Sequence, residues 1–190
     1  MLTSLLQQSL PWASQQATAK LAPLFSRTVA GAGEIVLAEG QLYEKAYLIE
    51  KGCLRLYFTR YDGREFSKNF YTAGVLVLPV TEQMWSEPSL FGIQSANESI
   101  LWRADAAKVR AALDNVGEWG TIQQKLTEHM ITAKLTREHE LLALTATERY
   151  QRFLEQFPGL AEEIPLVQIA TYLGITDVSL SRIRRNLRID

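Results

Sequence analysis

Between about residues 33 and 103, apolar and polar residues alternate in short runs with the two-residue period of β-strands. In the run CLRLYFT, Leu54, Leu56 and Phe58 fall on one face of a predicted strand. Arg55 falls on the opposite face, together with the tyrosine that follows two positions later. The pattern therefore predicts a segment built of strands.

Glycines divide this segment at intervals of 12, 11 and 11 residues, at Gly40, Gly52, Gly63 and Gly74. Such spacing is typical of turns between the strands of a sandwich or roll. Asp62 and Gly63 stand between two alternating runs, and this dipeptide is a strong signal for a tight hairpin. We expect an all-β roll here.

Helical patterns flank the predicted roll on both sides. Two short ones precede it, TSLLQQSL and SQQATAKLAPLF, separated by Pro11. After residue 104 the apolar spacing changes to the 3.6-residue period of helices. It predicts a short helix in ADAAKVRAALDNV, a long one from Gly117 to Leu144, and a third in TATERYQRFLEQF, before Pro158. The fold class is therefore α+β.

The long helix of about 28 residues would extend roughly 40 Å, more than a compact small domain needs. Its apolar residues follow spacings of 3, 4, 4 and 3 and predict a seam of Trp119, Ile122, Leu126, Met130 and Ala133. One interpretation is a dimerisation helix that packs against its copy. The other is a helix that lies on its own β-roll, and the two are compatible.

The segment PLVQIATYLGITDVSLSRIRRNL, residues 165–187, predicts two short helices around Gly174. Glycine adopts the left-handed conformation needed between them, and Thr176 is a suitable N-cap for the second helix. On that second helix, Leu180, Ile183 and Leu187 share one side and should be buried.

The opposite side of this helix is polar and basic, with Val178, Ser181, Arg182 and Arg185. Such a face is typical of a recognition helix in a helix–turn–helix motif. Arg182 or Arg185 would bind guanine edges and Val178 a thymine methyl group, while Ser179, Ser181 and Arg188 would bind phosphates. The alternatives are a solvated basic face and a surface that docks on an acidic protein.

Composition narrows the classes of function. The net charge of −1 means that any nucleic-acid-binding surface is local. The single cysteine, Cys53, excludes an internal disulfide and is interpreted as a small buried hydrophobe, so we expect a cytoplasmic protein. The longest apolar run, GVLVLPV, is too short to span a bilayer, and no basic residue precedes Lys20 as in a secretion signal.

Catalysis and metal binding are not expected. The predicted β-segment contains no histidine, although a cupin-type metal roll would need His, Asp or Glu ligands on its strands. The sequence shows no Ser–His–Asp set, no phosphate-binding glycine loop and no Cys–His pair. The only two histidines, His129 and His139, both fall on the long helix.

The order of roll, long helix and helix–turn–helix resembles the CRP/FNR superfamily of bacterial transcription regulators over nearly the whole chain. The likeness is carried by LAEG, AYLIEKGCLRLYF, YDGREFSKNFYTAG and IATYLGITDVSLSRIRRNL. It implies a jelly-roll-like, cyclic-nucleotide-binding-like β-roll with flanking helices in residues 1–116. A dimerisation helix in 117–144 and a helix–turn–helix DNA-binding domain in 145–190 would follow.

The resemblance also implies partners. These are a second copy of the chain, double-stranded DNA with a near-palindromic operator, and RNA polymerase. The family's base contacts map onto Asp177, Val178 and Arg182, with Arg185 close by. One departure is that no β-hairpin wing fits between Pro158 and Ile164, and the chain ends three residues after Leu187. We expect DNA binding without phosphate contacts from a wing.

The second departure concerns the effector. Family members that sense cyclic AMP hold its phosphate with an arginine and its ribose with a glutamate, but residues 69–102 contain no lysine or arginine. Pro79 stands at the position of the glutamate, and Ser89 and Leu90 stand at those of the arginine–serine pair. We expect no cofactor and no cyclic AMP binding in the usual manner.

Another ligand would meet an apolar pocket. Met84, Trp85, Leu90 and Phe91 are concentrated in this segment, and Lys134 and Leu135 would face it from the long helix. An apolar or neutral effector is one interpretation. The other, which such aromatic spacing favours, is that these side chains simply fill the core.

Overall fold

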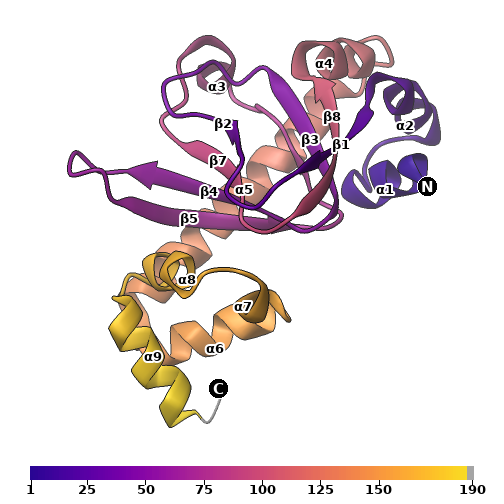
Figure 1. Cartoon of the computed structure of the whole chain (residues 1–190). Coiled ribbons are helices and arrows are strands. Elements are labelled where there is room, and N and C mark those ends of the chain that lie inside the picture. Colours follow the sequence, from indigo (N-terminus) through magenta and orange to yellow (C-terminus); the bar gives the residue numbers. More distant parts are fainter. Residues whose placement is uncertain (188–190) are drawn as a thin grey trace.

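In the computed structural model, which describes residues 1–187, two four-stranded antiparallel sheets form a β-roll. One sheet has the strand order β1 (Ser26–Ala30), β8 (Ser99–Asp105), β3 (Lys45–Lys51) and β6 (Leu76–Val77). The other has the order β2 (Ile35–Leu37), β7 (Gly92–Ser95), β4 (Cys53–Thr59) and β5 (Glu65–Thr72). The short helix α3 (Glu82–Ser86) interrupts the chain between β6 and β7 (Figure 1). The predicted β-roll is confirmed.

The core of the roll lies between the two sheets. Both contribute fully buried side chains to it, including Ile49 and Leu101 from one sheet and Leu54 and Ile93 from the other. Leu54 and Leu56 of β4 are buried in this core, as expected. Phe58, predicted on the same face, is 39% exposed, because the register of β4 shifts between Leu56 and Tyr57.

The predicted hairpin joins β4 and β5. Its turn places Gly63 at φ 79°, and the Arg60 amide donates to the Arg64 carbonyl over 2.8 Å. The Asp62 carboxylate accepts the Arg64 amide at 3.1 Å. Glycine reaches this left-handed conformation at little cost, which explains why the Asp-Gly pair specifies the turn.

The predicted N-terminal helices pack against one end of the roll. These are α1 (Leu2–Ser9) and α2 (Gln15–Leu21), followed by the 3-10 turn η1 (Ala22–Leu24). Helix α4 (Ala106–Asp114) lies beside them, and the long α5 (Trp119–Ala143) starts there (Figure 1). Their apolar faces form one core cluster with residues of β3 and β8.

The start of α5 belongs to this intrachain core, which corrects part of the predicted dimer seam. Trp119 and Ile122 are buried in the same core cluster as α4, and Trp119 packs against Trp85 of α3. Leu126 is partly buried against this cluster. Met130 and Ala133 are exposed. The helical period shows that one face of the helix is apolar, but it does not show whether the same chain or a second copy covers that face. Here the chain's own helices cover the first two turns.

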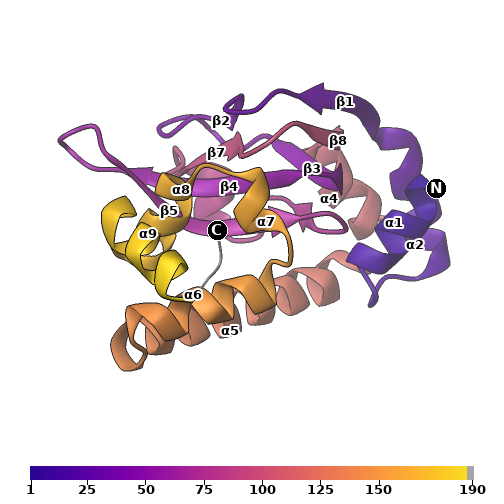
Figure 2. The ribbon, with the colours of Figure 1, turned by 60° about the horizontal axis from the view of Figure 1, so that its bottom comes forward.

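Four shorter helices follow α5: α6 (Ala146–Gln156), α7 (Leu160–Glu163), α8 (Leu166–Leu173) and α9 (Asp177–Asn186). We call them the helical unit. Helix α8 lies beside β5 (Figures 1 and 2), and α6 and α9 lie farther from the roll (Figure 1). The core of the helical unit includes Cys53, Phe70 and Ala96 of the roll, so the predicted division at residue 145 crosses a continuous core. Burial raises the pKa of the Cys53 thiol to about 12, as befits a buried hydrophobe.

Among the described residues, no helix combines the length and apolar character that crossing a membrane requires.

Candidate DNA interface

Helices α8 and α9 form a helix–turn–helix. Gly174 between them has φ 70° and ψ 32°, the left-handed conformation that ends α8, and the Ile175 amide donates to the Ala170 carbonyl at 3.0 Å. The Thr176 hydroxyl accepts the Ser179 amide at 3.2 Å and caps α9. The turn glycine and the cap therefore have the local roles that the sequence predicts.

One side of α9 is packed against the helical unit. Leu180 is 0% exposed, and Ile183 and Leu187 are partly buried against the same core. The predicted apolar stripe is confirmed in its burial, and it determines how α9 is rotated about its axis.

The opposite side of α9 faces solvent, with Asp177, Val178, Ser181, Arg182 and Arg185 exposed. The Asp177 carboxylate accepts the Val178 amide at 2.9 Å. Ser179 is half-buried, with its hydroxyl 2.9 Å from that of Thr176, so it is turned toward the cap. Arg188 lies outside the described residues.

The exposed guanidinium groups of this side are available to a ligand. Within residues 1–187, no carboxylate forms an ion pair with Arg182 or Arg185. A guanidinium presents donors in a planar fork that matches phosphate oxygens and the guanine edge. Helix α9 has 10 residues and is about 15 Å long. The major groove of B-form DNA is wide enough to admit an α-helix.

The connection before α8 contains only the short helix α7, and no strand follows β8 in the described part of the chain. The expected lack of room for a wing between Pro158 and Ile164 agrees with this arrangement.

Two arginines that the sequence analysis did not single out hold the helix–turn–helix to α5. The Arg149 guanidinium donates to the Leu173 carbonyl at 2.9 Å and to the Leu144 carbonyl at 2.6 Å. It thereby binds carbonyl groups at the C-terminal ends of both α8 and α5. Arg137 of α5 lies 4.0 Å from the centroid of the Tyr172 ring, and burial lowers the pKa of its guanidinium. The Arg149–Leu173 and Arg137–Tyr172 contacts join residues 24 and 35 positions apart, which sequence patterns do not reveal.

The residues of the predicted effector pocket differ in burial, and Met84 and Phe91 share one core cluster. Phe91 is buried in the core of the roll, Pro79 is buried, and Met84 is partly buried between two core clusters. Trp85 packs edge-on against Trp119 at 6.1 Å. Ser89 donates its hydroxyl to the Phe91 carbonyl at 2.7 Å, while Leu90, Lys134 and Leu135 are exposed.

A cation does lie beside these residues, although the sequence analysis missed it. The Lys68 ammonium group is 5.7 Å from the Phe91 ring centroid and 5.5 Å from that of Phe58. Desolvation lowers the pKa of Lys68, and repulsion from Lys134 lowers it further. Lys68 immediately precedes the segment 69–102, and it approaches Phe91 only through the pairing of strands.

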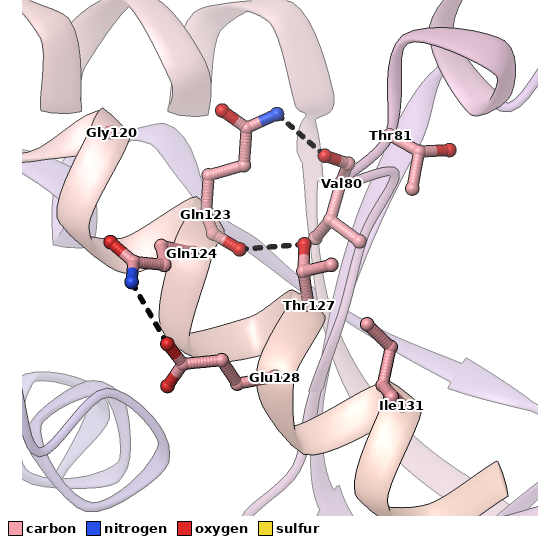
Figure 3. A pocket seen from close by; sticks show the side chains of 8 residues that line it. All are labelled: Val80, Thr81, Gly120, Gln123, Gln124, Thr127, Glu128 and Ile131. Carbon is pink, nitrogen blue, oxygen red and sulfur yellow. Dashed lines mark hydrogen bonds between the residues drawn. The ribbon is translucent and has the colours of Figure 1, made fainter.

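A shallow groove of about 380 Å³ separates α5 from the chain before α3 (Figure 3). The Gln123 side chain closes its base by donating to the Val80 carbonyl at 2.7 Å. Gln124 and Glu128 line its outer wall and are hydrogen-bonded to each other at 2.9 Å. Among residues 1–187, no three His, Cys, Asp or Glu side chains are grouped to hold a metal ion.

No protein-family profile and no curated protein matches the sequence. Solved structures do. FixK2 from Bradyrhizobium japonicum aligns with 86% of this chain and 84% of its own, with a TM-score of 0.76 and 20% identity. CLP from Xanthomonas campestris, a c-di-GMP responsive global regulator, aligns over 92% of both chains, with a TM-score of 0.71 and 12% identity.

A protein from Eubacterium rectale assigned to the CRP/FNR family aligns with 94% of this chain and 85% of its own. Its TM-score is 0.71 and its identity 14%. The two-sheet roll, the long α5 and the helix–turn–helix, in this order, give this protein the fold of the CRP/FNR regulators.

Proposed function

We propose that this protein is a sequence-specific DNA-binding transcription regulator, and that α9 is its recognition helix. The observation that carries the proposal is the two-sided structure of α9: Leu180 is buried, while Arg182, Arg185 and Val178 face solvent. A helix that only closed a fold would gain nothing from guanidinium groups on its free side that pair with no carboxylate of residues 1–187. The likeness to solved transcription regulators supports the same conclusion.

The protein acts as a homodimer through the outer part of α5. From Glu128 to Thr136 every side chain of this helix is exposed. Ile131 (53% exposed), Leu135 (61%) and Leu142 (81%) lie on one stripe, with spacings of 4 and 7 residues. A heptad-type stripe is the surface that a second copy of the same helix covers. Met130 and Ala133 of the predicted seam are exposed on the same part of the helix, and their contact with a second copy stays a prediction.

A two-fold dimer would present two copies of α9 to one face of the duplex. Its operator would then be a near-palindrome whose half-site centres are about 34–36 Å apart. Selection of bound duplexes from a random pool tests the proposal directly. Recovery of a palindrome supports it, whereas recovery of no preferred sequence contradicts it.

Salt dependence separates DNA binding from docking on an acidic protein. Binding to the selected duplex should weaken linearly in a plot of log affinity against log salt, because each neutralised phosphate releases counterions. A partner protein that binds while the duplex does not would favour the alternative function.

Replacing Arg182 with alanine is expected to remove base discrimination. The loss should be about 1–3 kcal/mol on the cognate duplex, because a bidentate contact to a base edge carries that much discrimination. Arg182→Lys keeps the charge and should retain binding to scrambled DNA while it loses preference for the operator. Fluorescence anisotropy with cognate and scrambled duplexes measures both. Equal losses on the two duplexes would contradict the role of Arg182 in reading bases.

Cyclic AMP is not the effector in the usual manner. Pro79 is buried and Ser89 is bonded to the backbone, so neither position offers the charged groups that a cyclic phosphate and its ribose require. Titration calorimetry at high protein concentration should show no heat of binding for cyclic AMP. A micromolar dissociation constant would contradict this expectation, and Lys68 would then be the cation to replace first.

A further inference from the structure

Strand β5 of the roll is in direct contact with α8, the first helix of the helix–turn–helix. The Ser67 amide donates to the Thr171 hydroxyl at 3.2 Å, and the Ser67 hydroxyl donates to the Gln168 carbonyl at 2.8 Å. Figures 1 and 2 both show α8 lying along β5. The helical unit is therefore joined to the roll by polar bonds of defined direction.

Ser67 is itself fixed from inside the roll. The Arg55 side chain is only 3% exposed, and its Nε donates to the Ser67 hydroxyl at 2.7 Å. Its Nη1 donates to the Glu65 carboxylate, and the guanidinium lies 5.0 Å from the Tyr57 ring centroid. Loss of a partner of a buried guanidinium costs free energy, because the charge is then left without compensation away from water. Because Ser67 accepts from Arg55, its single proton is directed at α8.

An apolar contact accompanies these bonds. The Phe70 ring of β5 lies 5.9 Å from Phe153, 5.9 Å from Phe157 and 5.4 Å from Tyr172, measured between centroids. The roll thus contributes one ring to the core of the helical unit. On its other side Tyr172 meets Arg137 of α5, so α8 is held between β5 and α5.

We propose that Ser67 and Thr171 are positioning residues that fix the direction of the recognition helix relative to the roll. Helix α9 follows α8 through the turn at Gly174 and the buried Leu180, so the direction of α8 determines that of α9. The roll, α5 and the helical unit then move as one body. In a dimer, this rigidity fixes the distance and angle between the two recognition helices. This inference rests on the proposed DNA-binding function and adds that the roll determines which spacing of half-sites is accepted.

The test compares operators of different spacing. The duplex recovered by selection is prepared at its own spacing, with one or two base pairs inserted or removed at its centre, and as an isolated half-site. We expect the wild-type protein to lose roughly tenfold in affinity or more for each one-base-pair change, because each change rotates and displaces one half-site.

The variant Ser67→Ala/Thr171→Val removes the bonds between β5 and α8. We expect it to lose less than about threefold per one-base-pair change, within an affinity range that one kcal/mol spans. Its affinity for the isolated half-site should equal that of the wild type, since α9 is untouched. Thr171→Ser, which keeps the hydroxyl, should restore the wild-type profile when combined with intact Ser67. Thr136→Val removes a hydroxyl from an exposed position of α5 and serves as the matched control.

If the double variant does not fold, as judged by circular dichroism, Thr171→Val alone is used, because it leaves the Arg55–Ser67 bond in place. An unchanged spacing profile in a folded variant would overturn the proposal. Tighter binding at the native spacing would also overturn it, since the contact would then hold the helix–turn–helix away from DNA. Absence of DNA binding by the wild-type protein would instead refute the proposed function, so the two failures are distinguishable.

Discussion

Replacing Phe153 with alanine is expected to lower the free energy of unfolding by about 3–5 kcal/mol, the range for truncating a buried phenylalanine. Phe153 is 1% exposed. Its ring centroid is 5.2 Å from Phe157, 5.8 Å from Tyr172 and 5.9 Å from Phe70. Removal of the ring would leave a cavity surrounded by other rings, which cannot close in without losing their own contacts.

Urea denaturation at a fixed protomer concentration, followed by circular dichroism, measures this loss. Phe58→Ala is the matched control, because Phe58 is 39% exposed and its truncation should cost less than about 1 kcal/mol. A similar cost for both variants would contradict the central position of Phe153. Because Phe70 belongs to the same cluster, the roll and the helical unit should unfold in one transition.

The features that sequence patterns predicted well are local. The Asp62–Gly63 turn and the glycine between α8 and α9 depend on backbone conformations that neighbouring residues hardly alter. The burial of Leu180 opposite Arg182 likewise depends on the helical period alone. For the same reason, the exposed face of the candidate DNA interface could be identified before the structure.

The features that could not be predicted depend on which helices and strands pack against each other. Strand alternation put Arg55 on the opposite face to Leu54, and that face is open in many sheets. Here the contact of β5 with α8 covers it, so Arg55 is buried as well. The bonds between Ser67 and α8 join residues about a hundred positions apart. No local pattern contains that information.

Helix α5 illustrates both cases. Its existence followed from the helical period, and its observed range, Trp119–Ala143, lies within the predicted one. The residues against which α5 packs could not be predicted in the same way, because two separate apolar stripes occupy different parts of its length. The first, with Trp119 and Ile122, meets α4 and Trp85, and the second begins at Ile131. A single seam drawn through the whole helix therefore combines residues that have different roles.

If the protein is the proposed dimer, replacing Leu135 with glutamate is expected to convert it to monomers. Affinity for the proposed palindromic operator should then fall by about 100-fold or more, because avidity from two linked half-sites is lost. Leu135 is 61% exposed and lies at the middle of the outer stripe, between Ile131 and Leu142. In a two-fold pair, each added carboxylate would face an apolar surface and its own copy, and both interactions are unfavourable.

Thr136→Glu adds the same charge to the adjacent position, which is also exposed and lies about 100° around the helix, away from the stripe. It should remain dimeric and bind the operator as the wild type does. Sedimentation equilibrium gives the mass of each variant, and duplex titrations give the affinities. Because Leu135 makes no contribution to the cores of a single chain, Leu135→Glu should keep its affinity for an isolated half-site. A dimeric Leu135→Glu variant would show that the two copies meet elsewhere, and the outer stripe of α5 would lose its proposed role.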